Sequence, residues 1–176
     1  MNHSARVFKR WLMYDYMGIV TLILGDFVSG IYFGFYCEPP LRRMYWLMIV
    51  TLGVLTAAVL VSPRFQGPDW RTFRLFCFIG TGFSALAPIV HAAMLFGFNT
   101  LGTMGVYYYF IEGAIMIIAS FFYERYIPER LWPGKFDIWG HSHTIFHVLV
   151  VMGTASHLLG LLSSFDYSYH HRSCSS

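Results

Sequence analysis

Residues 141–162 read HSHTIFHVLVVMGTASHLLGLL, an apolar stretch that carries histidines at its start. A run of about 20 mostly apolar residues is long enough for an α-helix to cross the hydrocarbon core of a bilayer. Four similar runs precede it, at about 13–36, 44–61, 74–96 and 102–123. Charged residues, proline or glycine bound each run, and barrel strands would need only about 9–11 residues. The sequence therefore predicts an all-α membrane protein with five transmembrane helices.

The composition excludes an ordinary soluble domain. Of the 176 residues, 56% are hydrophobic, 12 are basic and 9 are acidic, whereas a soluble domain carries about 25% charged residues. The five spans use most of the apolar residues and leave no room for a large soluble domain. The net charge of +3 is small and dispersed, so we expect no nucleic-acid partner. The odd number of cysteines argues against a disulfide framework; they are Cys37, Cys77 and Cys174.

The basic residues predict an orientation. Lysine and arginine are enriched in short cytoplasmic loops, and here nine of the twelve fall in the N-terminal segment and the second and fourth loops. We therefore expect the N-terminus on the cytoplasmic side and the C-terminus outside. The chain then divides into a cytoplasmic segment over 1–12, a membrane domain over 13–162 and a loose polar tail over 163–176.

The sharpest chemical signal is the pair of histidines at the start of the last span, His143 and His147. Residues at i and i+4 share one face of a helix, so both imidazoles can reach one metal ion. Zinc suits imidazole, and a catalytic zinc site adds a third protein ligand and a water. Asp15 opens the first span at the same predicted cytoplasmic depth. The sequence thus predicts a carboxylate and two imidazoles in one layer.

Other interpretations of these polar residues stay open. Histidines at a membrane interface also act as interfacial residues or bond neighbouring helices, and a macrodipole favours an aspartate such as Asp15 at a helix start. His91 and His157 lie at matching depth in the predicted outer half, where two imidazoles can hold a haem. For Glu112, in mid-span, we expect protonation or an interhelical hydrogen bond.

Five short motifs are distributed over nearly the whole chain. They are residues 15–19 (DYMGI), 32–37 (YFGFYC), 88–91 (PIVH), 127–139 (IPERLWPGKFDIW) and 142–150 (SHTIFHVLV). Together they resemble the signature of the adiponectin receptor and haemolysin III family, also called progestin and adipoQ receptors. The fungal members are the most similar in style.

The resemblance implies a seven-helix receptor in which the five spans match helices three to seven and the chain is truncated at its N-terminus. In such receptors three histidines hold a zinc ion near the cytoplasmic face, one from the second helix and two from the seventh. An aspartate of the third helix holds the zinc-bound water. By motif, His143 and His147 match the seventh-helix pair and Asp15 matches the aspartate. The second-helix histidine has no counterpart, and His3 is the nearest substitute.

The implied activity is zinc-dependent, ceramidase-like hydrolysis of a lipid amide, linked to signalling and to zinc or sterol homeostasis. The implied partners are a membrane lipid, either a sphingolipid or a fatty acid, within the bundle and a protein ligand on the outer side. The implied location is the plasma membrane or the endoplasmic reticulum. Two alternatives remain: a non-catalytic truncated membrane fragment without a complete metal site, and a haem protein ligated by His91 and His157.

Overall fold

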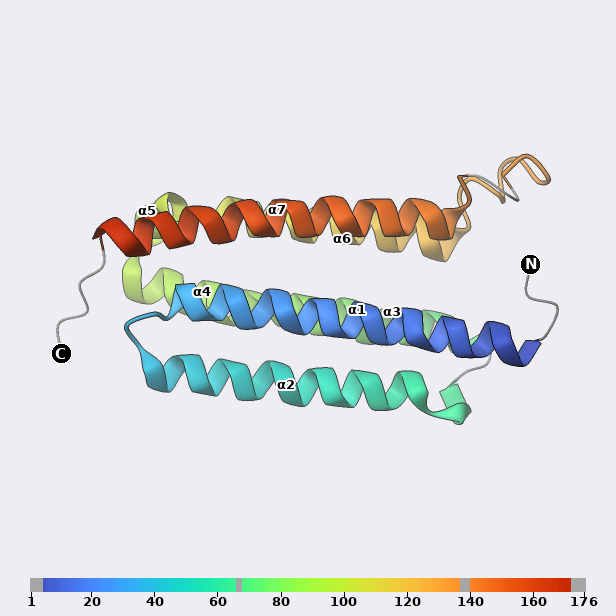
Figure 1. The fold of residues 1–176 in the computed structure, drawn as a ribbon, viewed down its shortest axis with the longest axis horizontal. Helices are drawn as coiled ribbons and strands as arrows, with labels where there is room; N and C mark the ends of the chain where they lie inside the picture. Colours follow the sequence, from blue (N-terminus) through green and yellow to red (C-terminus); the bar gives the residue numbers. More distant parts are fainter. Residues whose placement is uncertain (1–4, 66–67, 137–139, 172–176) are drawn as a thin grey trace. The chain divides into compact units, whose positions relative to one another are not determined.

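The computed structural model describes residues 5–65, 68–136 and 140–171, and all regular structure in these ranges is helical (Figure 1). The elements are α1 (Ala5–Gly34), α2 (Pro39–Val61), the short 3₁₀ turns η1 (Pro63–Phe65) and η2 (Pro68–Trp70), α3 (Arg71–Phe83), α4 (Leu86–Phe96), α5 (Phe98–Thr103), α6 (Val106–Arg125) and α7 (Ser142–His171).

Within the described ranges, five helical stretches are long and apolar enough to cross a membrane, and this confirms the predicted fold class. They are Arg10–Gly34, Pro39–Val61, Arg71–Phe96, Val106–Arg125 and Ser142–His171. The protein is therefore an integral, multi-pass membrane protein. The direction in which the helices cross stays a prediction.

The third span is interrupted between α3 and α4. Proline has no N–H, and its ring clashes with the carbonyl of the residue four positions earlier, which for Pro88 is Ser84. The break falls at that residue: the Ser84 hydroxyl donates to the Thr81 carbonyl at 2.6 Å, and Ala87 N–H bonds the Ser84 carbonyl at 3.2 Å. The predicted run 74–96 is thus two helices joined by a turn.

The helix boundaries differ from the predicted ones at three places. α1 already begins at Ala5, inside the predicted segment 1–12, and α6 begins at Val106 because Gly105 before it has a φ of 80°. α7 continues to His171, so the loose tail predicted from residue 163 is wrong as far as that residue. The reason is packing, because the hydroxyl of Ser164 in this stretch donates to the Met104 carbonyl at 2.8 Å.

The cysteines also differ from expectation. Cys37, in the turn that follows α1, is disulfide-bonded, whereas Cys77 in α3 is a free thiol. The expectation of no disulfide is therefore wrong for Cys37, because an odd number of cysteines leaves one thiol over without excluding a bond between the others. Cys174 lies outside the described residues.

The chain forms two compact units, Met1–Ile89 and Val90–Ser176. In the first unit α1 packs along α2, and α2 packs on α3. Its apolar core is built from Tyr16 and Val20 of α1 with Leu60 of α2. The indole N–H of Trp46 donates to the Val28 carbonyl at 3.1 Å, and this hydrogen bond links α2 to α1.

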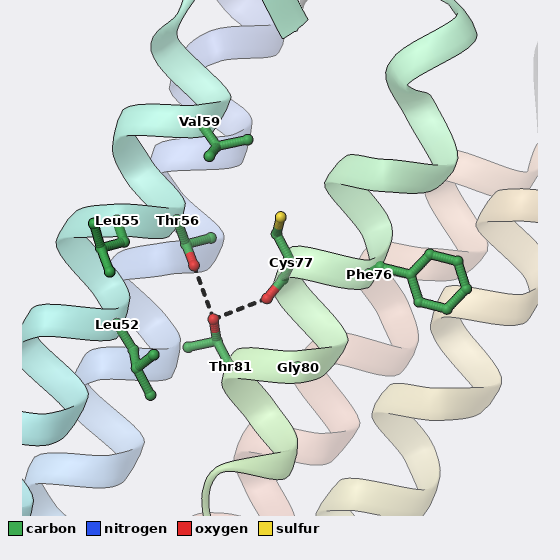
Figure 2. Close-up of a pocket in the computed structure, with 8 residues that line it drawn as sticks. All are labelled: Leu52, Leu55, Thr56, Val59, Phe76, Cys77, Gly80 and Thr81. Atoms are coloured by element: carbon green, nitrogen blue, oxygen red, sulfur yellow. Dashed lines mark hydrogen bonds between the residues drawn. The ribbon is translucent and has the colours of Figure 1, made fainter.

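Figure 2 shows a groove of about 230 Å³ between α2 and α3, with Thr56 and Thr81 among its lining residues. The two hydroxyls lie 2.8 Å apart, and Thr81 donates to the Cys77 carbonyl at 2.8 Å. Thr81 has only one hydroxyl proton, so Thr56 is the donor between the two threonines. Polar side chains inside a span form hydrogen bonds with one another in this way because lipid tails offer no hydrogen-bond partners.

In the second unit α6 and α7 pack against each other along their length. The contact uses small residues of α7: the Ser156 hydroxyl donates to the Tyr108 carbonyl at 2.9 Å, and a Cβ on Gly160 would lie 3.2 Å from the Tyr108 Cβ. Small residues let membrane helices approach closely. The packing fixes α7 on α6 and so positions the histidines at its start.

Candidate metal centre

His143 and His147 lie one turn apart near the start of α7. Their ring centroids are 4.7 Å apart, their planes are inclined by 48°, and a ring nitrogen of one lies within 4.8 Å of a ring nitrogen of the other. Two nitrogens on one tetrahedral zinc would be about 3.3 Å apart. The pair could hold a metal ion, as its spacing predicts.

Aromatic side chains surround this pair. Tyr123 of α6 meets the His143 ring edge-on at 5.7 Å and the Phe146 ring at 5.4 Å. Phe146 in turn meets the His147 ring at 5.5 Å. Packing of this kind limits ring rotation and holds ligands close to their working geometry.

The loop between α6 and α7 folds back onto the start of α7. α6 ends at Arg125 and is followed by Tyr126, which has a left-handed φ of 52°. Gly140 turns the chain into α7 with a φ of 74°. Glu129 then reaches Ser142: its Oε1 accepts the Ser142 N–H at 2.7 Å and the Ser142 hydroxyl at 2.9 Å. This cap was not predicted, because 13 residues separate the two in sequence; only the motif over 127–139 marked the segment.

Glu129 has a lowered pKa. Partial burial alone would raise the pKa of this carboxyl. The opposing hydrogen bonds, from its own backbone N–H and from the N–H and hydroxyl of Ser142, together with the nearby His141, bring the pKa below its ordinary value. Glu129 is therefore ionised at neutral pH and places a negative charge at the N-terminus of α7, where the helix dipole favours it.

Asp15 lies in α1 and is half-buried. It belongs to the first unit, whereas His143 and His147 belong to the second. The structure thus brings the two histidines together within one unit, and the role of Asp15 beside them stays a prediction. His3, the suggested substitute ligand, lies outside the described residues.

A second polar pair joins α6 to α7 within their spans. The Nδ1 atom of His157 lies 2.8 Å from Oε2 of Glu112, and the Tyr109 ring meets the imidazole edge-on at 5.0 Å. His157 is 4% exposed. The interhelical hydrogen bond expected for Glu112 is thereby confirmed. The haem hypothesis for His91 and His157 stays a prediction. The Nδ1 atom of His157 already contacts Glu112, so Nε2 would be the nitrogen left to ligate a haem iron.

A family model described as haemolysin-III related matches residues 1–158. This chain belongs to that family. Haemolysin-III relatives include heptahelical transmembrane protein 4 of Arabidopsis thaliana, 41% identical over 88% of this chain and 40% of the relative. The ADIPOR-like receptor IZH2 of Saccharomyces cerevisiae is 34% identical over 94% and 52%, and the adiponectin receptor protein of Drosophila melanogaster is 33% identical over 98% and 39%.

These comparisons confirm the family that the motifs indicated. The haemolysin-III chain described here spans about half or less of the length of these relatives. The names of these relatives, such as adiponectin receptor, describe those proteins. The range matched by the family model, residues 1–158, includes Asp15, His143 and His147.

Proposed function

We propose that this haemolysin-III family member is a receptor-like membrane protein with a zinc site at the start of α7, acting on lipid amides of the ceramide type. The observation that carries the proposal is the contact between His143 and His147, whose ring nitrogens lie within 4.8 Å of one another. Supporting it are the helices that are long and apolar enough to span a membrane and the relatives named as receptors.

The donor set fits zinc. Two imidazoles from one helix face are common zinc ligands, and the aromatic contacts of Tyr123 and Phe146 hold them in place. Two protein ligands leave coordination positions for water and for a further ligand. When bound, zinc would polarise an amide carbonyl and lower the pKa of a coordinated water towards neutrality. The same chemistry would suit the hydrolysis of a lipid amide.

Asp15 is the residue of this chain that we assign to proton transfer. A carboxylate can orient an attacking water, take up its proton, and return a proton to the amine that leaves as the C–N bond breaks. The products would be a fatty acid and a sphingoid base. A substrate with long acyl chains reaches such a site through the bilayer, which is consistent with the apolar spans. A protein ligand on the outer side remains part of the proposal.

Zinc content of the purified chain tests the metal site. We expect about one zinc ion per chain and its loss in His143→Ala and His147→Ala. His170→Ala is the matched control, because His170 lies on the same helix and its side chain is 58% exposed. Metal-free protein with intact helices, or zinc that survives both substitutions, would contradict the proposal.

Release of fatty acid from a ceramide in detergent micelles tests the activity. Asp15→Asn keeps the size of the side chain and removes its basicity. It should slow hydrolysis by about 100-fold or more while leaving zinc content unchanged. Equal rates for wild type and variant would remove Asp15 from the mechanism.

A second candidate is a non-catalytic membrane protein of the same family. One observation favours it: among the described residues, the histidine pair supplies only two imidazole ligands, whereas a catalytic zinc site has three protein ligands. This candidate predicts folded helices without retained zinc and without hydrolysis, so the same measurements separate the two.

A further inference from the structure

Glu129 connects the loop after α6 to the first residue of α7. One carboxylate oxygen accepts both the backbone N–H and the hydroxyl of Ser142, at 2.7 and 2.9 Å. Ser142 is only 3% exposed, so these hydrogen bonds are shielded from water. Hydrogen bonds to an ionised acceptor are stronger than neutral ones. A single carboxylate therefore holds both donors of the residue at which the helix begins.

The position of Ser142 links this contact to the histidines. The first four N–H groups of a helix have no intrahelical partner, and the first turn is held only where other groups satisfy them. His143 follows Ser142 directly and lies in that turn, whereas His147 lies one turn deeper. Of the two, His143 is the imidazole whose placement depends on the cap.

A second cap lies on the other side of His143. The Nδ1 atom of His141 accepts the Thr144 N–H at 3.0 Å, and the Thr144 hydroxyl lies 2.7 Å from the same nitrogen. Side chains from outside the helix thus satisfy the N–H groups of Ser142 and Thr144, the residues on either side of His143. Of these two capping side chains, His141 directly precedes the helix, whereas Glu129 lies 13 residues before Ser142 in the loop.

From these contacts we infer that Glu129 is a positioning residue of the metal site: it holds the first turn of α7 so that His143 stands in register with His147. The inference rests on the proposed zinc site. A metal held by both imidazoles binds only those molecules in which both are in place. Its apparent affinity therefore falls in proportion to the fraction of chains whose first turn is formed.

The test measures zinc affinity of the full chain in detergent by competition with a chelator, together with hydrogen exchange along α7. We expect Glu129→Ala to weaken apparent zinc affinity by up to about tenfold, because the loss of a helix cap destabilises the first turn by an amount that corresponds to about this factor. Exchange should accelerate over residues 143–145 and stay unchanged in the rest of α7. Glu129→Gln keeps an oxygen that can accept both donors and should restore most of the affinity.

Glu38→Ala is the matched control. Glu38 is the residue directly before α2, and its side chain makes no cap hydrogen bond there, so its removal should leave zinc affinity unchanged. Ser142→Ala removes one of the two donors and should have a smaller effect than Glu129→Ala. This variant keeps the test decisive if Glu129→Ala fails to fold.

A double-mutant cycle completes the test. His143→Ala should bind zinc too weakly to keep it through purification, so its residual affinity is measured by titration with added zinc. If Glu129 acts through His143, Glu129→Ala should cause no further loss of that residual affinity. Unchanged affinity in Glu129→Ala, while zinc still depends on both histidines, would overturn the inference and leave the proposed function intact. Zinc binding that is independent of both histidines would overturn the proposed function, and the inference with it.

Discussion

The imidazole of His157 and the carboxylate of Glu112 lie 2.8 Å apart and join α7 to α6 within the membrane-spanning region. Both groups are ionisable, and the side chains are 5% and 14% exposed. Such residues are costly in a span unless they are paired. The pair therefore holds the two helices that frame the histidine pair at the start of α7.

Removing one member of this pair should destabilise the protein. His157→Ala leaves the Glu112 carboxyl group without its histidine and should lower the free energy of unfolding by about 1–3 kcal/mol. Unfolding in denaturant, followed by circular dichroism, measures the change. The double variant with Glu112→Ala should recover part of the loss, because no polar group is then left behind. A double variant less stable than His157→Ala would contradict this account.

The close approach of α6 and α7 predicts a second effect. Gly160→Leu places a side chain against Tyr108 and Tyr109, whose atoms lie within 3.2–3.4 Å of an added Cβ. We expect a loss of about 1–3 kcal/mol from overpacking. Gly113→Leu on α6 is the control, since nothing lies within 4 Å of its added Cβ. Similar thermal stabilities of the two variants would argue against the packing described.

The orientation predicted from the basic residues can be tested in intact cells. Cys37 is disulfide-bonded, and disulfides persist in oxidising compartments, which agrees with an outer position for the turn after α1. In a background with the native cysteines replaced by serine, a membrane-impermeant maleimide should label Glu38→Cys and not Arg64→Cys. Labelling of Arg64→Cys alone would reverse the orientation.

The lowered pKa of Glu129 predicts a dependence on pH. A carboxylate with a depressed pKa in the folded state stabilises it fully above the ordinary glutamate pKa of about 4.3, and the stabilisation is lost as the pH falls through the lower folded-state value. Wild type should thus unfold at a higher temperature than Glu129→Gln at neutral pH. Thermal scans should show this gap close only below about pH 4.3. A gap that closes at higher pH would indicate a raised pKa.

Much of the helical architecture was predictable because span length depends on local composition. The five apolar runs correspond to the five spans, and even the break at Ser84 has a local cause in Pro88. The end of α7 was not predictable in this way. Residues 163–171 look like a polar tail, but Ser164 bonds a carbonyl at the end of α5, and only the packing of the two helices reveals that partner.

The candidate site also has one part that local sequence predicts and other parts that depend on tertiary packing. The spacing of His143 and His147 fixes their common helix face, so their contact was predictable. The pairing of Glu112 with His157 depends on the register between α6 and α7, which no local pattern encodes. The contact between Glu129 and Ser142 depends on the path of a loop that turns back at Gly140. The contact was not predictable because the two residues lie 13 positions apart in sequence.

X-ray absorption at the zinc edge of the purified full chain tests the central claim most directly. The account predicts about one zinc ion per chain whose spectrum shows scattering from two imidazole rings. It also predicts that this imidazole signal falls to one ring in either His143→Ala or His147→Ala if the ion is retained. Zinc without imidazole scattering, or a spectrum unchanged by both substitutions, would contradict the assignment of a metal site to the start of α7.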